Sequence, residues 1–149
     1  MAMPSAEDLN TLLRGYDQLY GIKFVEVSDT DVHARVLLRD ELRQPFGHLH
    51  GGVYASLAES MCSLATALAV LDGGMTALGL SNNTSFLRPI NEGSVHAQAT
   101  RLHRGRTTWV WDVRFSDDDG RLCAVTRMTL AIRPVPGDIP DLSAVAGEG

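Results

Sequence analysis

The chain has 149 residues, the length of a single domain with a hydrophobic core of its own. Hydrophobic residues make up 44% and charged residues 21% of the sequence, a globular composition that excludes a fibrous or largely disordered chain. Its 18 acidic and 13 basic residues give a net charge of −5, which excludes a general electrostatic attraction to nucleic acid.

Neither end of the chain nor its cysteines suggest an unusual class of protein. The N-terminal sequence MAMPSAEDLN has neither the basic nor the apolar segment of a secretory signal, so a cytoplasmic protein is expected. Cys62 and Cys123 have neither the number nor the spacing of a disulfide framework or a zinc site, and both are expected to be reduced core residues. Residues 134–149 are rich in Pro, Gly and small side chains, which predicts a flexible tail after one domain over residues 1–133.

The first elements are predicted to be a short helix and a hairpin. Residues 5–20 begin with Ser5, a residue type that caps helix N-termini, and continue with apolar residues at helical spacing. Residues 22–38 alternate between apolar and polar residues on either side of the polar sequence SDTD, the pattern of two strands with one exposed face.

A long apolar helix is predicted from about Gly52 to Leu71. It ends at the sequence DGG, where Gly73 or Gly74 can take the left-handed conformation that closes a helix. The segment nearly has the length of a transmembrane helix, but it contains Glu59 and several hydroxyl residues and lacks basic flanks. A buried helix of a soluble protein is therefore expected, with no membrane as partner.

Beyond this helix the hydrophobic period changes to two, which predicts four strands. They cover residues 76–89, 93–103, 107–116 and 122–134, and we expect them to be consecutive antiparallel neighbours. The last is apolar on nearly both faces and is therefore expected in the centre of a sheet.

This order of elements predicts an α+β fold. An antiparallel sheet of five to six strands can bury its apolar side by curling around the single long helix, which explains why that helix is apolar almost all round. This is the hotdog fold, here with a short additional N-terminal helix. Its open sheet edges can be covered by joining two sheets edge to edge in a dimer.

Glu59 lies in the middle of the predicted long helix, on a narrow stripe of small polar residues that includes Ser56, Ser60 and Ser63. A stripe facing solvent usually carries several Lys, Arg and Glu residues, so this one suits a cleft or an interface. A carboxylate without a basic residue within one turn is costly to bury and is expected to have a partner or a task. Catalysis and a structural role both stay open at this point.

The sequence HGG at the head of the same helix is a second candidate element. Unpaired N–H groups and the helix dipole favour negative charge there, as on a tetrahedral oxyanion, although a plain glycine entry to a helix looks the same. Gly51 and Glu59 are eight positions apart, or about 12 Å along the axis. Both can act on one carbonyl only if they come from two chains, which a two-fold dimer with antiparallel helices provides.

A metal site is not expected at this helix head. His48 and His50 form an H-x-H pair, but no third ligand is spaced nearby.

Four segments, RQPFGHLHGGVYASLAE, SNNTSFLRP, GRTTWVWDV and GRLCAV, together resemble the hotdog-fold acyl-CoA thioesterases. The resemblance spans about residues 20–133, and the spacing from HGG to Glu59 is its most specific part. The chain is most similar to the branch of 4-hydroxybenzoyl-CoA, phenylacetate-pathway and 1,4-dihydroxy-2-naphthoyl-CoA thioesterases, whose catalytic carboxylate lies on the central helix. The resemblance implies hydrolysis of an acyl-CoA, with an aromatic acyl group preferred. It implies no cofactor, because coenzyme A is part of the substrate.

The resemblance also implies roles for five residues. Glu59 would act on the thioester carbonyl, either as a nucleophile or as a general base that activates water. The N–H of Gly51 would donate to the oxyanion, and Gln44 and His50 would be orienting groups. Ser63 would supply a hydroxyl one turn beyond Glu59, where relatives often have Thr.

Binding of coenzyme A is implied at two further places. Arg88, before Pro89, and Arg104, Arg106 and Thr107, in the sequence HRGRTT, could form charge-assisted bonds with phosphate groups. The sequence departs from the family at Arg106, where relatives frequently have Ser. The alternative is that each arginine is a solvated strand end.

Other functions stay open from the sequence. A non-catalytic acyl-CoA-binding hotdog module would not need Glu59, Gln44 and HGG together. A hotdog hydratase or dehydratase normally uses an Asp/His pair at the helix entry, and no Asp lies near His50. A medium-chain acyl group is the alternative to an aromatic one. The expected assembly is a homodimer with composite sites, itself part of a tetramer.

Overall fold

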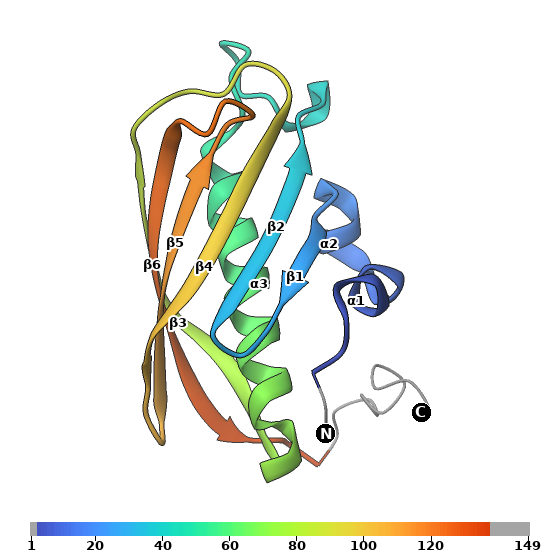
Figure 1. Cartoon of the computed structure of the whole chain (residues 1–149), viewed down its shortest axis with the longest axis vertical. Helices are drawn as coiled ribbons and strands as arrows, with labels where there is room; N and C mark the ends of the chain where they lie inside the picture. The colour runs from blue at the N-terminus through green and yellow to red at the C-terminus, as the bar shows by residue number, and fades with distance from the viewer. Residues whose placement is uncertain (1–2, 138–149) are drawn as a thin grey trace.

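The structure of the protein, a computed structural model, describes residues 3–137. A single antiparallel sheet of six strands, in the spatial order β1-β2-β4-β5-β6-β3, wraps around one long helix, α3 (Figure 1). The strands are β1 (Lys23–Val27), β2 (Asp31–Leu37), β3 (Met75–Phe86), β4 (Ser94–Arg104), β5 (Thr108–Ser116) and β6 (Leu122–Pro134). The helices are α1 (Ala6–Leu12), α2 (Gly15–Tyr20) and α3 (Gly51–Val70), with 3-10 turns η1 (Asp40–Leu42) and η2 (Leu71–Gly73). The predicted hotdog fold is confirmed; the tail expected over residues 134–149 lies outside the described residues from 138 on.

The hydrophobic core lies between α3 and the face of the sheet that it crosses. Trp109 and Trp111 of β5 are buried in this core. The indole N–H of Trp111 donates to the hydroxyl of Thr66 in α3 over 3.0 Å, and both side chains are completely buried. Cys62 and Cys123 are buried and free, as predicted. The Trp111–Thr66 bond fixes the rotation of the helix relative to the sheet.

Helix α3 begins and ends within one residue of its predicted limits. His50 is the N-cap residue, and its ring Nδ1 accepts a hydrogen bond from the N–H of Gly52. After Val70 the chain makes the short turn η2, and Gly74, with a φ of 68°, takes the left-handed conformation. By length and composition alone this segment could cross a membrane, but much of it is buried against the sheet in this fold.

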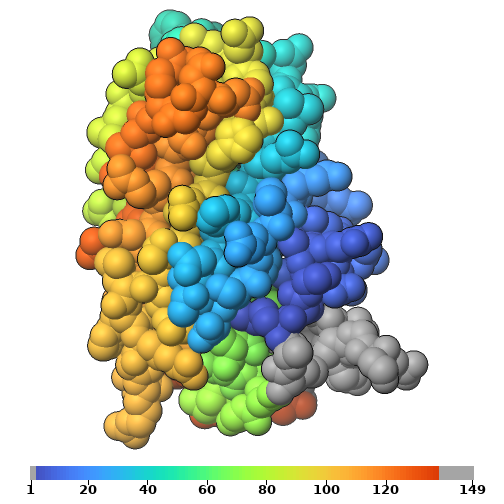
Figure 2. Space-filling view, in the orientation of Figure 1, coloured from blue at the N-terminus to red at the C-terminus, as the bar shows by residue number. Residues whose placement is uncertain are grey.

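The N-terminal segment forms two short helices where the sequence predicts one. The chain is extended at Leu13 and Arg14, so that α1 and α2 can pack against different partners. Asn10 of α1 exchanges two hydrogen bonds with the backbone of Phe24 in β1, while Tyr20 of α2 donates to Ser60 of α3. A single straight helix could not reach both. In Figure 2, α1 and the hairpin β1–β2 lie in front of much of α3, and the C-terminal end of α3 is visible below them.

The last four strands are not consecutive neighbours, so this part of the prediction is wrong. Strands β4, β5 and β6 do form a meander, but β3 pairs with β6 at the far edge, and β4 pairs with β2. The physical reason lies in β6, which is apolar on both faces and is stabilised by a strand on each side. Strand β3 is therefore an edge strand, with most of its side chains exposed.

We expect Thr66→Val to lower the free energy of unfolding by about 1–3 kcal/mol, because the change keeps the shape of the side chain but leaves the buried indole N–H of Trp111 without an acceptor. Chemical denaturation of the purified protein measures this. The matched control is Thr129→Val in β6, a half-buried threonine whose side chain makes no hydrogen bond within the described residues. An equal loss in both variants would contradict the role given to the Trp111–Thr66 bond.

Candidate functional site

The head of α3 presents one backbone N–H that has no acceptor within residues 3–137. The N–H of Gly52 donates to the His50 ring and that of Val53 donates to the His50 carbonyl, both at the first turn. The N–H of Gly51, at the positive end of the helix dipole, has no hydrogen-bond acceptor in the part of the chain that the structure describes. The ring of Phe86 in β3 packs over Gly51, and a Cβ at this position would lie 2.9 Å from its Cζ. A larger residue at position 51 would therefore displace Phe86.

A shallow depression of about 360 Å³ joins three of the predicted site residues: Gln44, Gly51 and Arg88. Gln44 lies in the turn before α3, where its side-chain Oε1 accepts from the N–H of Phe46. The N–H of Gln44 donates to the carbonyl of His48, so a backbone hydrogen bond also stabilises this turn. The structure thus brings three residues with expected roles to the same depression: the expected oxyanion donor, the expected orienting amide and one expected CoA-binding arginine.

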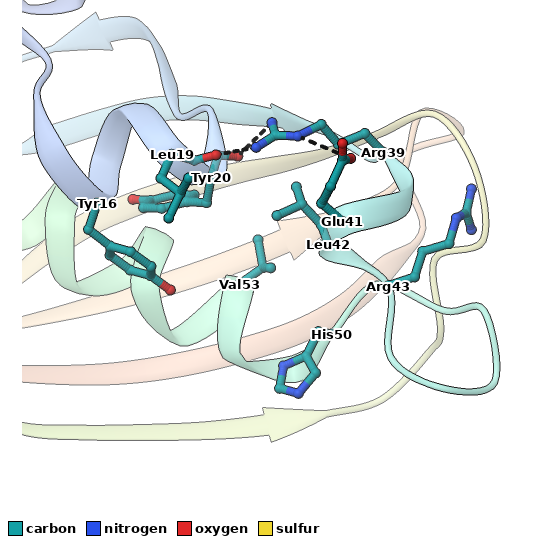
Figure 3. A pocket seen from close by; sticks show the side chains of 9 residues that line it. All are labelled: Tyr16, Leu19, Tyr20, Arg39, Glu41, Leu42, Arg43, His50 and Val53. Atoms are coloured by element: carbon teal, nitrogen blue, oxygen red, sulfur yellow. Dashed lines mark hydrogen bonds and ion pairs between the residues drawn. The ribbon is translucent and has the colours of Figure 1, made fainter.

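A second cavity, of about 470 Å³, lies on the other side of the helix head, between α2, η1 and α3 (Figure 3). Most of its lining is apolar or aromatic: Tyr16, Leu19, Tyr20, Leu42 and Val53. His50 borders it. The guanidinium of Arg39 at its rim is turned onto the carbonyls that end α2, and that of Arg43 binds the carbonyls of Gly47 and Asn91. With these charges engaged elsewhere, the interior is suited to an apolar group.

Glu59 is half-buried, two turns beyond the helix head, and lies next to the edge strand. The hydroxyl of Ser63 donates to Glu59 Oε1 over 3.0 Å, as the predicted position one turn farther along allows. On its other side the carboxylate lies against the backbone of Gly79 in β3. Glu59 and Ser63 are thus brought together, whereas neither is near Gly51 within the chain.

The other polar side chains of the stripe are used inside the subunit. The hydroxyl of Ser56 is hydrogen-bonded to the hydroxyl of Tyr16 in α2. The hydroxyl of Ser60 accepts a hydrogen bond from the hydroxyl of Tyr20 and donates one to the carboxylate of Asp17. Burial raises the pKa of Tyr20, so this phenol stays protonated and can donate to Ser60. Ser56 and Ser60 therefore pack against α2 of the same chain, whereas Glu59 and Ser63 lie on the side of α3 that faces β3.

The structure separates Arg104, Arg106 and Thr107 from Arg88. The three residues lie at the β4–β5 turn, at the end of the molecule opposite the head of α3 (Figure 1). Arg104 pairs with Asp29 at 3.3 Å and lies 5.1 Å from the ring centre of Trp109, whereas Arg106 is exposed and makes no ion pair within the described residues. One chain alone cannot use both groups on one ligand.

Two residues at the site were missed from the sequence: Gly79 and Phe86, which contact Glu59 and Gly51 from the edge strand. Their only sequence signal is a glycine inside a strand pattern, which often marks a close approach of another group. Among the described residues, no group of three or more His, Cys, Asp and Glu side chains could hold a metal ion.

Comparison with known proteins identifies the family. Residues 46–124 match the family described as the thioesterase superfamily. The crystal structure of a mutant thioesterase from Pseudomonas aeruginosa has a TM-score of 0.85 and 38% identity, covering 90% of this chain and 97% of that one. A thioesterase from Haemophilus influenzae has a TM-score of 0.84 and 34% identity, covering 93% and 97%. The 1,4-dihydroxy-2-naphthoyl-CoA hydrolase of Escherichia coli is 37% identical over 111 residues, 74% of this chain and 81% of the relative. The chain therefore belongs to the thioesterase superfamily and is a thioester hydrolase.

Proposed function

We propose that the protein hydrolyses the thioester of an acyl-CoA to a free acid and coenzyme A, at a site shared between two subunits. The observation that carries this proposal is the pair of half-sites on α3: the N–H of Gly51 at the helix head, which has no acceptor among residues 3–137, and the carboxylate of Glu59, which accepts a hydrogen bond from Ser63. The likeness to a CoA-thioester hydrolase of Escherichia coli supports coenzyme A as the leaving group.

The edge strand β3 supports the shared site, because both half-sites border it. Gly51 contacts Phe86, the last residue of β3, and Glu59 contacts Gly79 in the interior of the same strand. Leu78 and Leu80 of this strand are 56% and 60% exposed, as expected of an edge that another chain can cover. If two copies of β3 pair antiparallel about a two-fold axis midway between Gly79 and Phe86, the partner's Glu59 arrives beside Gly51. Each dimer then has two equivalent sites.

In this arrangement the thioester oxygen accepts a hydrogen bond from the N–H of Gly51, and the helix dipole stabilises the charge that develops on it. The partner's Glu59 acts on the carbonyl carbon by one of two routes. As a nucleophile it forms an anhydride with the acyl group and releases the CoA thiolate, and water then hydrolyses the anhydride. As a general base it takes a proton from the attacking water. Because Ser63 binds Oε1, Oε2 is the oxygen left to react.

Gln44 and His50 are proposed to orient the thioester at the helix head, since Gln44 shares the depression with Gly51 and His50 caps the same turn. Antiparallel packing of two α3 helices would also bring the β4–β5 turn of the partner to the end of the molecule that carries Arg88. Arg88 of one subunit and the partner's Arg104, Arg106 and Thr107 could then bind the phosphates of one coenzyme A. The reaction needs no further cofactor.

The acyl group is proposed to be aromatic. A cavity of about 470 Å³ beside His50, with the rings of Tyr16 and Tyr20 in its wall, falls in the size range of small-molecule sites (Figure 3). The Escherichia coli relative is named for a bicyclic aromatic acyl-CoA. A medium-chain acyl group is the alternative, because a flexible chain could also occupy an apolar space of this volume.

We expect the wild-type protein to hydrolyse benzoyl-type CoA esters faster than medium-chain esters, and Glu59→Gln to lose at least about 10³-fold in kcat, because the amide can neither attack nor accept a proton. Steady-state release of free thiol from a panel of acyl-CoAs measures both. Glu7→Gln, at an exposed position on α1, is the matched control. Equal activity of Glu59→Gln and wild type would refute the role of Glu59, and faster hydrolysis of medium-chain esters would refute the aromatic preference.

We expect two inactive variants to complement each other in mixed dimers. Gly51→Pro removes the N–H at the first helical position, where the backbone accepts proline, and the extended conformation of His50 is compatible with a following proline. The proline Cβ would also displace the ring of Phe86 in the same subunit, so the damage stays within the Gly51 half-site. A mixed dimer of Gly51→Pro and Glu59→Gln subunits retains one intact composite site of two. Equimolar mixing with free subunit exchange should therefore recover roughly a quarter of wild-type activity.

Each variant alone is the control for this experiment, and sedimentation of the mixture reports whether dimers or the expected tetramers form. No recovery of activity after demonstrated subunit exchange would show that each subunit works with its own Glu59.

A further inference from the structure

The carboxylate of Glu59 fills a space that exists only because residue 79 has no side chain. A Cβ built on Gly79 would lie 2.6 Å from Oε1, 2.9 Å from Oε2 and 3.1 Å from Cδ of Glu59. These distances are well inside normal van der Waals contact. Any other residue at position 79 would therefore exclude the carboxylate from the place it now occupies.

A side-chain hydrogen bond also holds strand β3 against α3, one helical turn before Glu59. The side-chain amide of Asn82 donates to the carbonyl of Ala55 over 2.9 Å. Ala55 precedes Glu59 by four residues, so this is the carbonyl that the helical N–H of Glu59 uses. Between Gly79 and Ser81 the pairing of β3 with β6 shifts by one residue, a bulge that bends the strand locally. The backbone at Gly79 is thus fixed relative to the base of the Glu59 side chain.

We propose that Gly79 is a positioning residue, which lets the carboxylate of Glu59 settle between the Ser63 hydroxyl and the backbone of β3. This inference rests on the catalytic role proposed for Glu59. A glutamate side chain has three rotatable bonds, and a contact on one side with a hydrogen bond on the other removes much of that freedom. A carboxylate fixed in this way can meet the carbonyl in the neighbouring subunit without first having to be ordered.

A methyl group at position 79 is expected to move the carboxylate and leave the fold unchanged. The atoms that it would meet are the far end of a flexible, half-buried side chain. Gly79 does not have a positive φ, so alanine can adopt its backbone conformation without strain. Within the subunit Gly79 is exposed, and in the proposed dimer its strand also meets the partner's β3, so the mass in solution of the variant is compared with that of the wild type.

The first test is Gly79→Ala. We expect kcat to fall roughly 10- to 100-fold, as for other displacements of about 1 Å, with KM changed less than about twofold because the oxyanion donor and the arginines are untouched. Gly73→Ala is the matched control, since a Cβ there meets only Met75 Cγ at 4.0 Å. Mass in solution and the midpoint of unfolding verify that both variants keep their assembly and fold. An unchanged kcat in Gly79→Ala would overturn the proposal.

The second test is rescue by a shorter carboxylate. Glu59→Asp removes one methylene and so vacates the space that the new methyl group needs. In the Gly79→Ala background, Glu59→Asp should therefore lower kcat much less than it does in the wild-type background, or even raise it. The fold-losses in kcat of the two single variants should then not multiply in the double variant. Losses that multiply would mean that Gly79 acts independently of Glu59, and the proposal would be wrong.

A third measurement separates this inference from the proposed function. The ¹³C chemical shift of the Glu59 carboxyl carbon, assigned by its absence in Glu59→Gln, should change in Gly79→Ala and not in Gly73→Ala. If Glu59→Gln is fully active but the shift changes, the contact with Gly79 stands and the catalytic role fails. If the shift is the same in wild type and Gly79→Ala, the positioning role fails whatever the activity of Glu59→Gln.

Discussion

The packing of α3 against the sheet is the constraint on which the rest of the structure depends. The helix buries Leu57, Met61 and Ala65 completely against the strands, and the bond from Trp111 to Thr66 fixes its rotation. Because that face of the helix is buried in the core, the directions in which its other faces point are fixed as well. One side meets α2 through Ser60, and another presents Glu59 to the edge strand. A small rotation of the helix would alter both contacts.

A rigid helix also explains why the proposed site is divided between two subunits. The free N–H exists only at the first turn, because every later N–H is used inside the helix. The carboxylate is two turns farther along, and the helix cannot bend to bring them together. Strand β3 borders both places, and it is one of the two edge strands of the sheet, with no strand paired to its outer edge among residues 3–137. The same edge that needs covering is therefore the one about which a two-fold axis would complete the site.

Two glycines have matching roles in this arrangement. At Gly51 the missing side chain admits the ring of Phe86, and at Gly79 it admits the carboxylate of Glu59. In both cases a helix and the edge strand approach each other more closely than a Cβ would allow. Strand β3 is exposed and locally bulged, and few of its side chains are buried in the core. Its conformation can therefore fit the proposed site without a loss of core packing.

Much of the fold follows from local patterns in the sequence. The apolar run over residues 52–71 and the period of two beyond it determine the elements to within three residues, because hydrophobic spacing reflects which face is buried. The break at Leu13 and Arg14 was missed, because nothing local shows that α1 and α2 have different packing partners. The position of β3 beside β6 was missed for the same reason, since strand order is a long-range property.

The sequence by itself determined the chemistry available at the site: a glycine helix head, one carboxylate eight residues later and a hydroxyl one turn beyond it. Fixed helical spacing was enough to place Ser63 on Glu59 and to exclude Gly51 from the same chain's carboxylate. Only the tertiary structure decided that Gly79 and Phe86 meet these residues, and that Arg88 lies far from the β4–β5 turn. The reason is physical: positions along one helix are set by local geometry, whereas contacts between a helix and a distant strand depend on how the whole core packs.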